Sequence, residues 1–109
     1  MAKSKFHNIK VKGFDSKKEA KRYLELMAMY KAGEISKPNK QVPFELIPSQ
    51  YIGKKCVERA VKYIADFTYY KNNELVVEDV KSAFTKQLPV YILKRKLMLF
   101  IHKIQIKEV

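Results

Sequence analysis

Apolar runs lie on both sides of an Asn-Asn pair, and this pattern predicts an antiparallel hairpin over residues 63–82. Both flanking segments are rich in β-branched and aromatic residues, and Asn72-Asn73 tolerates the positive φ angles of a two-residue turn. In that register Asp66 faces Asp79. Facing side chains of an antiparallel pair have Cβ atoms roughly 5 Å apart, so two carboxylates are expected to share one face.

Like charges at that separation destabilise a sheet unless a positive charge lies beside them, and a divalent cation is the simplest such charge. Side chains alternate along a strand, so Lys81 points to the face of Asp79, whereas Glu78 and Val80 point to the other face. The hairpin therefore predicts a cluster of two acids and a lysine. Two alternatives stay open: an exposed hairpin with solvated charges, and a four-residue turn that shifts the register.

The first helix is expected to begin at Ser16 and to end near Gly33, a typical residue just past a helix C-terminus. Residues 16–19 form a capping box, in which the carboxylate of Glu19 satisfies a backbone N–H at the helix start. Glu19 also borders the apolar side of the helix, so its carboxylate alternatively leans towards the sheet. The residues alone favour the cap. The predicted buried stripe consists of Ala20, Tyr23, Leu24, Met27 and Tyr30.

Prolines divide the middle of the chain. Apolar and polar residues alternate near residues 42–47, which predicts a strand limited at both ends by proline. Residues 49–56 are expected to form a loop that contains Gly53. A long strand from about Val57 to Tyr70 then enters the hairpin.

The last part of the chain predicts a helix followed by a strand. Pro89 suits the first turn of a helix, and the expected buried stripe consists of Ile92, Leu93, Leu97 and Phe100. Ile104 and Ile106 then alternate with polar residues. Strand, helix and strand joined by short links predict a parallel, right-handed crossover. The order is therefore α-β-β-β-α-β, an α+β fold with a four-stranded mixed sheet and a helix on each side.

The length of 109 residues suits one small domain, residues 1–109, in which residues 1–13 form a basic N-terminal arm. No apolar run approaches the roughly 20 residues of a membrane span, and the basic start lacks the apolar stretch of a signal peptide. We therefore expect a cytoplasmic protein without membrane contact. Cys56 is the one cysteine, and His7 and His102 are distant, which argues against a structural zinc site.

The formal net charge is +12, and the charges are unevenly distributed. Residues 1–40 carry eleven Lys and Arg against four acids, residues 82–109 carry six against one, and residues 41–81 carry six of each. The two ends are basic, and the acidic cluster lies in the neutral middle. This layout suits a polyanion that is bound by basic surfaces and presented to a metal-binding centre.

The acidic positions resemble a known catalytic motif. Asp66 is followed by twelve residues and then by Asp79-Val80-Lys81, and Glu19 lies on the predicted first helix. With the element order, this pattern resembles the PD-(D/E)XK nuclease superfamily, which implies a restriction-endonuclease-like αβββαβ core. Within the superfamily, the chain looks most like small phage proteins of the Holliday-junction-resolvase type. This likeness covers nearly the whole chain, including residues 14–20 and 93–97. The chain is also similar to the TnsA endonuclease domain of a transposase.

The chain departs from the superfamily pattern at two positions. Ala65 precedes the first acid where the motif has proline, and the second acid is Asp79 where many members carry glutamate. Glu78 is a further carboxylate beside the motif, but strand alternation favours Asp79. The first departure is common in the superfamily and changes little in the expected activity.

The resemblance implies metal-dependent hydrolysis of DNA phosphodiester bonds. Carboxylate oxygens suit Mg²⁺, and Mn²⁺ is an expected substitute. By the family pattern Asp66, Asp79 and the carbonyl oxygen of Val80 bind the ion, Glu19 binds a metal-bound water or a second ion, and Lys81 orients the attacking water or stabilises developing negative charge. Branched DNA such as a Holliday junction is the implied substrate, in phage recombination or DNA processing inside a bacterial host.

Partners follow from the same argument. Symmetric cutting of two strands needs two active centres, which predicts a homodimer, and a phage replication or recombination protein is a further possible partner. Phosphate contacts are expected from basic residues of the arm, the first helix and the last helix, namely Lys10, Lys12, Lys17, Lys18, Lys21, Arg22, Lys94, Arg95 and Lys96. The main alternative is a basic nucleic-acid-binding protein without catalysis. A phage adaptor that binds another protein is a third.

Overall fold

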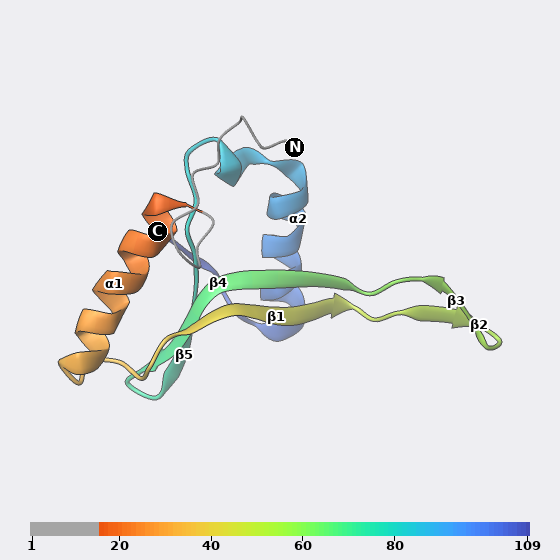
Figure 1. The fold of residues 1–109 in the computed structure, drawn as a ribbon. Helices are drawn as coiled ribbons and strands as arrows, with labels where there is room; N and C mark the ends of the chain where they lie inside the picture. The colour runs from red at the N-terminus through yellow and green to blue at the C-terminus, as the bar shows by residue number, and fades with distance from the viewer. Residues whose placement is uncertain (1–15) are drawn as a thin grey trace, which may run out of the picture.

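The computed structural model describes residues 16–109 and shows a mixed sheet with two helices (Figure 1). The predicted basic arm, with Lys10 and Lys12, lies outside the described residues. The elements are α1 (Lys17–Lys31), β1 (Asn39–Ile47), β2 (Gln50–Ile52), β3 (Lys55–Glu58), β4 (Val61–Lys71), β5 (Glu74–Asp79), a 3₁₀ turn (Thr85–Gln87), α2 (Pro89–Leu97), a π-helical turn (Met98–His102) and β6 (Lys107–Glu108).

The main sheet has four strands in the order β1-β4-β5-β6. The pairs β1–β4 and β4–β5 are antiparallel, and β5–β6 is parallel. The predicted fold class, an α+β fold with a four-stranded mixed sheet and two helices, is confirmed, and its elements follow the expected order once the small β2–β3 sheet is set aside. No helix in residues 16–109 is long and apolar enough to cross a membrane.

The predicted hairpin is present with the predicted register. Lys71 pairs with Glu74, and Phe67 pairs with Glu78. The turn residues Asn72 and Asn73 have φ angles of 53° and 68°, which are the left-handed values that a tight type I′ turn requires and that asparagine tolerates. This register brings Asp66 of β4 next to the end of β5.

Helix α1 has the expected ends but buries a different side. Ser16 caps the helix, because its Oγ accepts a hydrogen bond from the backbone N–H of Glu19 at 3.1 Å, and Gly33 follows the helix with a φ of +80°. The predicted stripe is wrong at Leu24, which is 69% exposed, and at Tyr30. The buried residues are Glu19, Ala20 and Leu26. Polar residues of α1 pair with the sheet, so the buried side includes charges that a hydrophobic pattern does not count.

Helix α2 also begins as predicted, with Pro89 in its first turn, but its stripe differs. Tyr91 and Met98 are buried, whereas Leu93 and Phe100 are largely exposed. The predicted stripe included Leu93 and Phe100 and omitted Tyr91 and Met98, so this part of the chain buries a different side from the predicted one.

The largest difference from the expectation lies before β4. Residues 49–56 are not a loop, because β2 and β3 pair as an antiparallel hairpin around Gly53, which has a φ of +64°. The expected strand over 57–70 is consequently divided into β3 and β4. Strand β1 is longer than predicted and contains Pro43, which an edge strand permits because its outer side needs no backbone donor.

Two apolar clusters hold the helices to the sheet. Leu26 of α1 packs with Phe67 and Tyr69 of β4. On the other side of the molecule, Tyr91 of α2 and Met98 pack in a cluster whose further buried members are Leu46, Tyr63, Ala65, Val77 and Ile106. Figure 1 shows the two helices on opposite sides of the sheet, with the end of β5 between them.

Candidate functional site

A cleft with a volume of about 530 Å³ opens where α1, β4, β5 and α2 meet. Glu19 of α1, Asp66 of β4, and Asp79 and Lys81 at the end of β5 all line it. These are the four residues that the sequence motif singled out as catalytic, and they come from three elements. The fold therefore brings the predicted catalytic residues together in one cavity.

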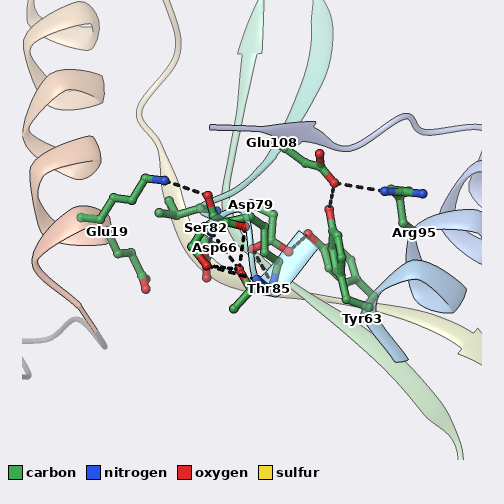
Figure 2. Close-up of polar contacts among 12 residues, drawn as sticks. Glu19, Tyr63, Asp66, Asp79, Ser82, Thr85, Arg95 and Glu108 are labelled. Carbon is green, nitrogen blue, oxygen red and sulfur yellow. Dashed lines mark hydrogen bonds and ion pairs between the residues drawn. The ribbon is translucent and has the colours of Figure 1, made fainter. Parts of the chain in front are cut away.

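Asp66 and Asp79 form the centre of the cleft (Figure 2). Oδ2 of Asp66 accepts a hydrogen bond from the backbone N–H of Val80 at 2.8 Å, which holds the two strand ends together. Oδ2 of Asp79 accepts a hydrogen bond from the hydroxyl of Tyr63 at 2.7 Å. The ammonium nitrogen of Lys81 lies 3.5 Å from Oδ1 of Asp79. Each carboxylate therefore accepts a hydrogen bond from the other arm of the β4–β5 hairpin.

The electrostatics of the pair favour a positive charge between them. Burial raises the pKa of Asp79, and hydrogen bonding to the Asp66 carboxyl raises it further, to about 7, although the Tyr63 hydroxyl and Lys81 act in the opposite direction. Burial and the hydrogen bond to Asp79 raise the pKa of Tyr63, so its hydroxyl stays a donor. A second carboxyl beside the buried carboxyl of Asp79 disfavours its charged form, and a cation between Asp66 and Asp79 would offset that cost.

Glu19 is linked to this pair by a residue that the sequence did not reveal. Gln41 of β1 donates from Nε2 to Oε2 of Glu19 at 3.0 Å and to Oδ1 of Asp66 at 3.4 Å. Gln41 has a φ of 53°, a left-handed backbone conformation that is uncommon for glutamine. Glu19 is 5% exposed. Its backbone N–H is part of the capped start of α1, and its carboxylate contacts Gln41 of the sheet. An isolated glutamine in a strand gives no signal that sequence reasoning could use.

Lys81 is positioned by two further contacts. Its Nζ lies 4.3 Å from the centre of the Tyr91 ring, within the range of a cation–π interaction, and its backbone carbonyl accepts a hydrogen bond from Nζ of Lys18 at 2.7 Å. The Tyr91 hydroxyl in turn donates to Glu108 at 2.5 Å. The aromatic ring and the helix lysine both restrict Lys81, and the sequence pattern predicted neither contact.

Glu78 points away from the cleft. Arg22 donates two hydrogen bonds to its carboxylate, at 2.8 and 2.7 Å, and the hydroxyl of Tyr69 donates a third. Burial alone would raise the pKa of Glu78, but the bonds from Arg22 and Tyr69 outweigh it and hold the pKa below its usual value. Glu78 is thus compensated within the fold, and the choice of Asp79 over Glu78 as the motif acid agrees with the geometry.

Comparison with protein families shows which family the chain belongs to. A family model described as "Protein of unknown function (DUF1064)" matches residues 1–108. The chain belongs to the DUF1064 family. A search of curated proteins finds no match. The family description states no activity, so the activity of this DUF1064 protein has to be argued from its cleft.

The basic residues predicted to contact phosphate fall into different environments. Lys94 of α2 lines the cleft, as does Lys62 of β4, which the sequence analysis did not single out. Arg22 is engaged by Glu78 and by Glu25, which gives it a structural role. The others are Lys17, Lys18, Lys21 and Lys96, which lie on the helices, and Arg95, whose Nη1 lies 3.4 Å from Oε2 of Glu108.

The donor set of the cleft suits a hard divalent cation. Within residues 16–109, no three acidic, histidine or cysteine side chains converge closely enough to enclose a metal ion. Mg²⁺ does not need such a cage, because it commonly binds through one or two carboxylates, several waters and substrate phosphate. Asp66 and Asp79 supply two carboxylates, and Val80 lines the same cleft. The residues that line the cleft of this DUF1064 chain therefore fit a magnesium ion.

Proposed function

We propose that this DUF1064 protein is a Mg²⁺-dependent endonuclease that hydrolyses phosphodiester bonds in DNA. The observation that carries the proposal is the pair of facing carboxylates, Asp66 and Asp79, beside Lys81 in a cleft of a strongly basic protein. Neither a simple DNA-binding surface nor an adaptor explains two acids that face each other in a chain of net charge +12. The resemblance to the PD-(D/E)XK pattern supports the same activity.

Each acid of the cleft has a distinct role in the proposal. Asp66 and Asp79 hold the ion, which when bound lowers the pKa of a coordinated water and offsets charge on the phosphate. The bond from Tyr63 leaves Oδ1 of Asp79 directed towards Lys81. Glu19 lies one amide away from Asp66, through Gln41, and binds a water of the ion. Because the amide of Gln41 lies between Glu19 and Asp66, the carboxylates of Glu19, Asp66 and Asp79 do not enclose a single ion.

Lys81 acts on the reacting groups. Its ammonium group orients the attacking water or stabilises the negative charge that develops on the phosphate. The ring of Tyr91 restricts where the ammonium group lies. Lys62 and Lys94, at the rim of the cleft, bind the phosphates on either side of the reacting one.

The substrate is branched DNA, and the active unit is a homodimer. None of the described residues that line the cleft forms a module that reads base edges, so the shape of the DNA selects the site. A second copy of the chain supplies the second active centre that symmetric cutting requires. The exposed apolar side chains of Leu93 and Phe100, which are 58% and 74% exposed, provide a surface for pairing.

The test is a cleavage assay with purified protein. A labelled four-way junction, the matching linear duplex and a flap are incubated with Mg²⁺, Mn²⁺ or chelator, beside the Asp79→Ala variant. The proposal predicts cutting that requires the metal, disappears in Asp79→Ala and is fastest on the junction. Salt-sensitive binding without cutting under either metal would contradict the proposal and favour the non-catalytic binding protein.

A further inference from the structure

The hairpin of β2 and β3 projects from the sheet as a separate two-stranded ribbon (Figure 1). All seven residues of these two strands are exposed. Tyr51 and Ile52, next to the turn, are 61% and 74% exposed. An isolated two-stranded ribbon is marginally stable in water. The large apolar side chains at its tip are not buried, so they contribute no hydrophobic stabilisation to it. The ribbon therefore has the properties of a surface that is covered by a partner.

The charges of the ribbon indicate the chemistry of that partner. Between residues 50 and 60 the basic residues are Lys54, Lys55 and Arg59, and the one acid is Glu58. None of these four makes an ion pair within the described part of the chain. Unpaired cations next to an exposed aromatic ring suit phosphates and bases.

The ribbon is continuous with the cleft. It grows out of β4, whose first residues Lys62, Tyr63 and Ile64 line the cleft wall. At about 3.3 Å per strand residue, the eight steps from Val61 to Gly53 reach roughly 26 Å, which corresponds to about eight base-pair steps of 3.4 Å. A substrate that enters the cleft and continues along β4 would therefore meet the ribbon over most of one helical turn.

We propose that the β2–β3 ribbon binds double-stranded DNA beside the site of cleavage, with Lys54 and Lys55 on the phosphates and Tyr51 and Ile52 in the groove. The width of a two-stranded ribbon matches the major groove. This inference rests on the proposed function in one respect, namely that DNA is the substrate. It extends that proposal by placing the duplex that flanks the cleaved bond along the β2–β3 ribbon.

A second copy of this chain is the competing occupant. Its exposed apolar surface on α2 carries Lys94 and Lys96 among the apolar side chains. Docking the basic tip of the ribbon on the α2 surface of a second copy would bring lysines of both copies together, and each copy has a net charge of +12. Double-stranded DNA is negatively charged, so it attracts the tip instead. Charge complementarity thus favours DNA over a second copy.

The test compares two charge-matched double variants. Lys54→Gln/Lys55→Gln removes two charges from the tip, and Lys31→Gln/Lys71→Gln removes two from exposed positions at the far ends of α1 and β4. Binding to a labelled duplex of about 20 base pairs is followed by fluorescence anisotropy in chelator, over a series of salt concentrations. Light scattering reports the oligomeric state of each protein.

Because the tip variant cannot neutralise two of the phosphates, its slope of log K against log salt should be shallower by about 1.8. If all proteins bind equally at 1 M salt, this slope corresponds to roughly 60-fold weaker binding at 0.1 M salt. The control should keep the wild-type slope. An unchanged slope in the tip variant would overturn the proposal, as would a tip variant that loses its oligomeric state instead. Because this measurement is made in chelator, it does not depend on cleavage. A failure of the cleavage assay with Mg²⁺ and Mn²⁺ would refute the nuclease and leave the DNA contact of the ribbon standing.

Tyr51→Ala, with Tyr70→Ala as its matched exposed control, separates the groove contact from charge. The proposal expects Tyr51→Ala to weaken duplex binding about 5- to 160-fold with an unchanged salt slope, the range for the loss of one aromatic contact with a base. Equal binding by the two tyrosine variants would exclude a groove contact at this residue and overturn that part of the proposal.

Discussion

Glu78 and Asp79 are neighbours on β5, and both are buried, but they meet opposite partners. Glu78 is 0% exposed and receives two hydrogen bonds from Arg22. Asp79 is 4% exposed, points to the other face and lies against a second acid, Asp66. The hydrogen bonds of Arg22 lower the pKa of Glu78 despite its burial, whereas burial and Asp66 raise the pKa of Asp79 to about 7.

The different partners of Glu78 and Asp79 indicate which of two buried carboxylates is the better candidate for a metal-binding site. Strand alternation sends neighbouring side chains to opposite faces, so a single strand carries a structural acid, Glu78, and the acid that we propose as functional, Asp79. The structural acid has an arginine built into the fold as its partner. The functional acid has a like charge beside it and opens into a cavity. Burial is common to both, and the partner distinguishes them.

The largest effect is expected for Lys81→Ala, which removes the cation on the functional side. Loss of one group that stabilises developing charge costs about 10²- to 10³-fold in rate, while the fold should persist because Lys81 lies at the end of β5. Single-turnover cleavage rates provide the measurement. The control is Lys71→Ala at the other end of the hairpin, an exposed lysine, which should cut like the wild type. Similar rates for the two variants would end the catalytic assignment.

Glu78→Gln tests the structural side of the comparison. Removal of the buried partner of this ion pair leaves Arg22 with the exposed Glu25 as its counter-charge, so the free energy of unfolding should fall by about 3 kcal/mol. The rate of cleavage per folded molecule should be unchanged. Urea denaturation measures the stability, with Glu74→Gln on the same strand as the exposed control. Unaltered stability would show that the pair does not hold α1 to the sheet.

The same ion pair predicts a pH dependence. The folded-state pKa of Glu78 is lower than its unfolded value, so its contribution to stability is fully present above the unfolded pKa of about 4.3 and is lost as the pH falls through the folded pKa. Stability measured between neutral and acid pH should therefore fall less steeply in Glu78→Gln than in the wild type. Parallel curves would contradict the assignment.

Gln41→Ala should have an intermediate effect. Without the amide between Glu19 and Asp66, both carboxylates lose a donor that fixes their orientation. Residues that orient metal ligands typically contribute 10- to 100-fold to metal affinity, so the Mg²⁺ concentration for half-maximal cleavage should rise by about that factor. Asn39→Ala, an exposed residue of the same strand, is the control. A lower rate at an unchanged Mg²⁺ requirement would argue against this role.

The smallest effect is expected for Tyr63→Phe, which removes only the hydroxyl that binds Asp79. A single hydrogen bond to a charged group contributes about 1.5–3 kcal/mol in stability, but Lys81 still contacts the other oxygen of Asp79. We expect a loss of up to about tenfold in cleavage rate and little change in DNA affinity. Tyr70→Phe, an exposed tyrosine of the same strand, should show neither change.

Local sequence rules predicted the parts of the fold that depend on neighbouring residues. Asn72-Asn73 predicted the hairpin and its register, and Ser16 and Gly33 predicted the ends of α1. The position of Asp66 opposite the end of β5 followed from this register. The prediction of the catalytic cluster therefore depended on a two-residue turn, whose geometry the sequence determines well.

Contacts between distant segments were not predictable in the same way. Arg22 and Glu78 are separated by 56 positions, and no local pattern links them, so the buried side of α1 was misplaced. Gln41 adopts a left-handed conformation that its residue type does not suggest. The β2–β3 ribbon was missed because its residues are exposed within the described part of the chain, and hydrophobic patterns indicate structure only where one face is buried.

The central claim is that Asp79 binds a cation, whereas Glu78 stabilises the fold through its ion pair with Arg22. Mn²⁺ uptake tests this claim most directly. Electron paramagnetic resonance of free Mn²⁺ is recorded with wild type, Asp79→Asn and Glu78→Gln, each folded and in the presence of the same duplex. The account predicts that the wild type and Glu78→Gln bind one more ion per chain than Asp79→Asn. Equal uptake by the wild type and Asp79→Asn would contradict it.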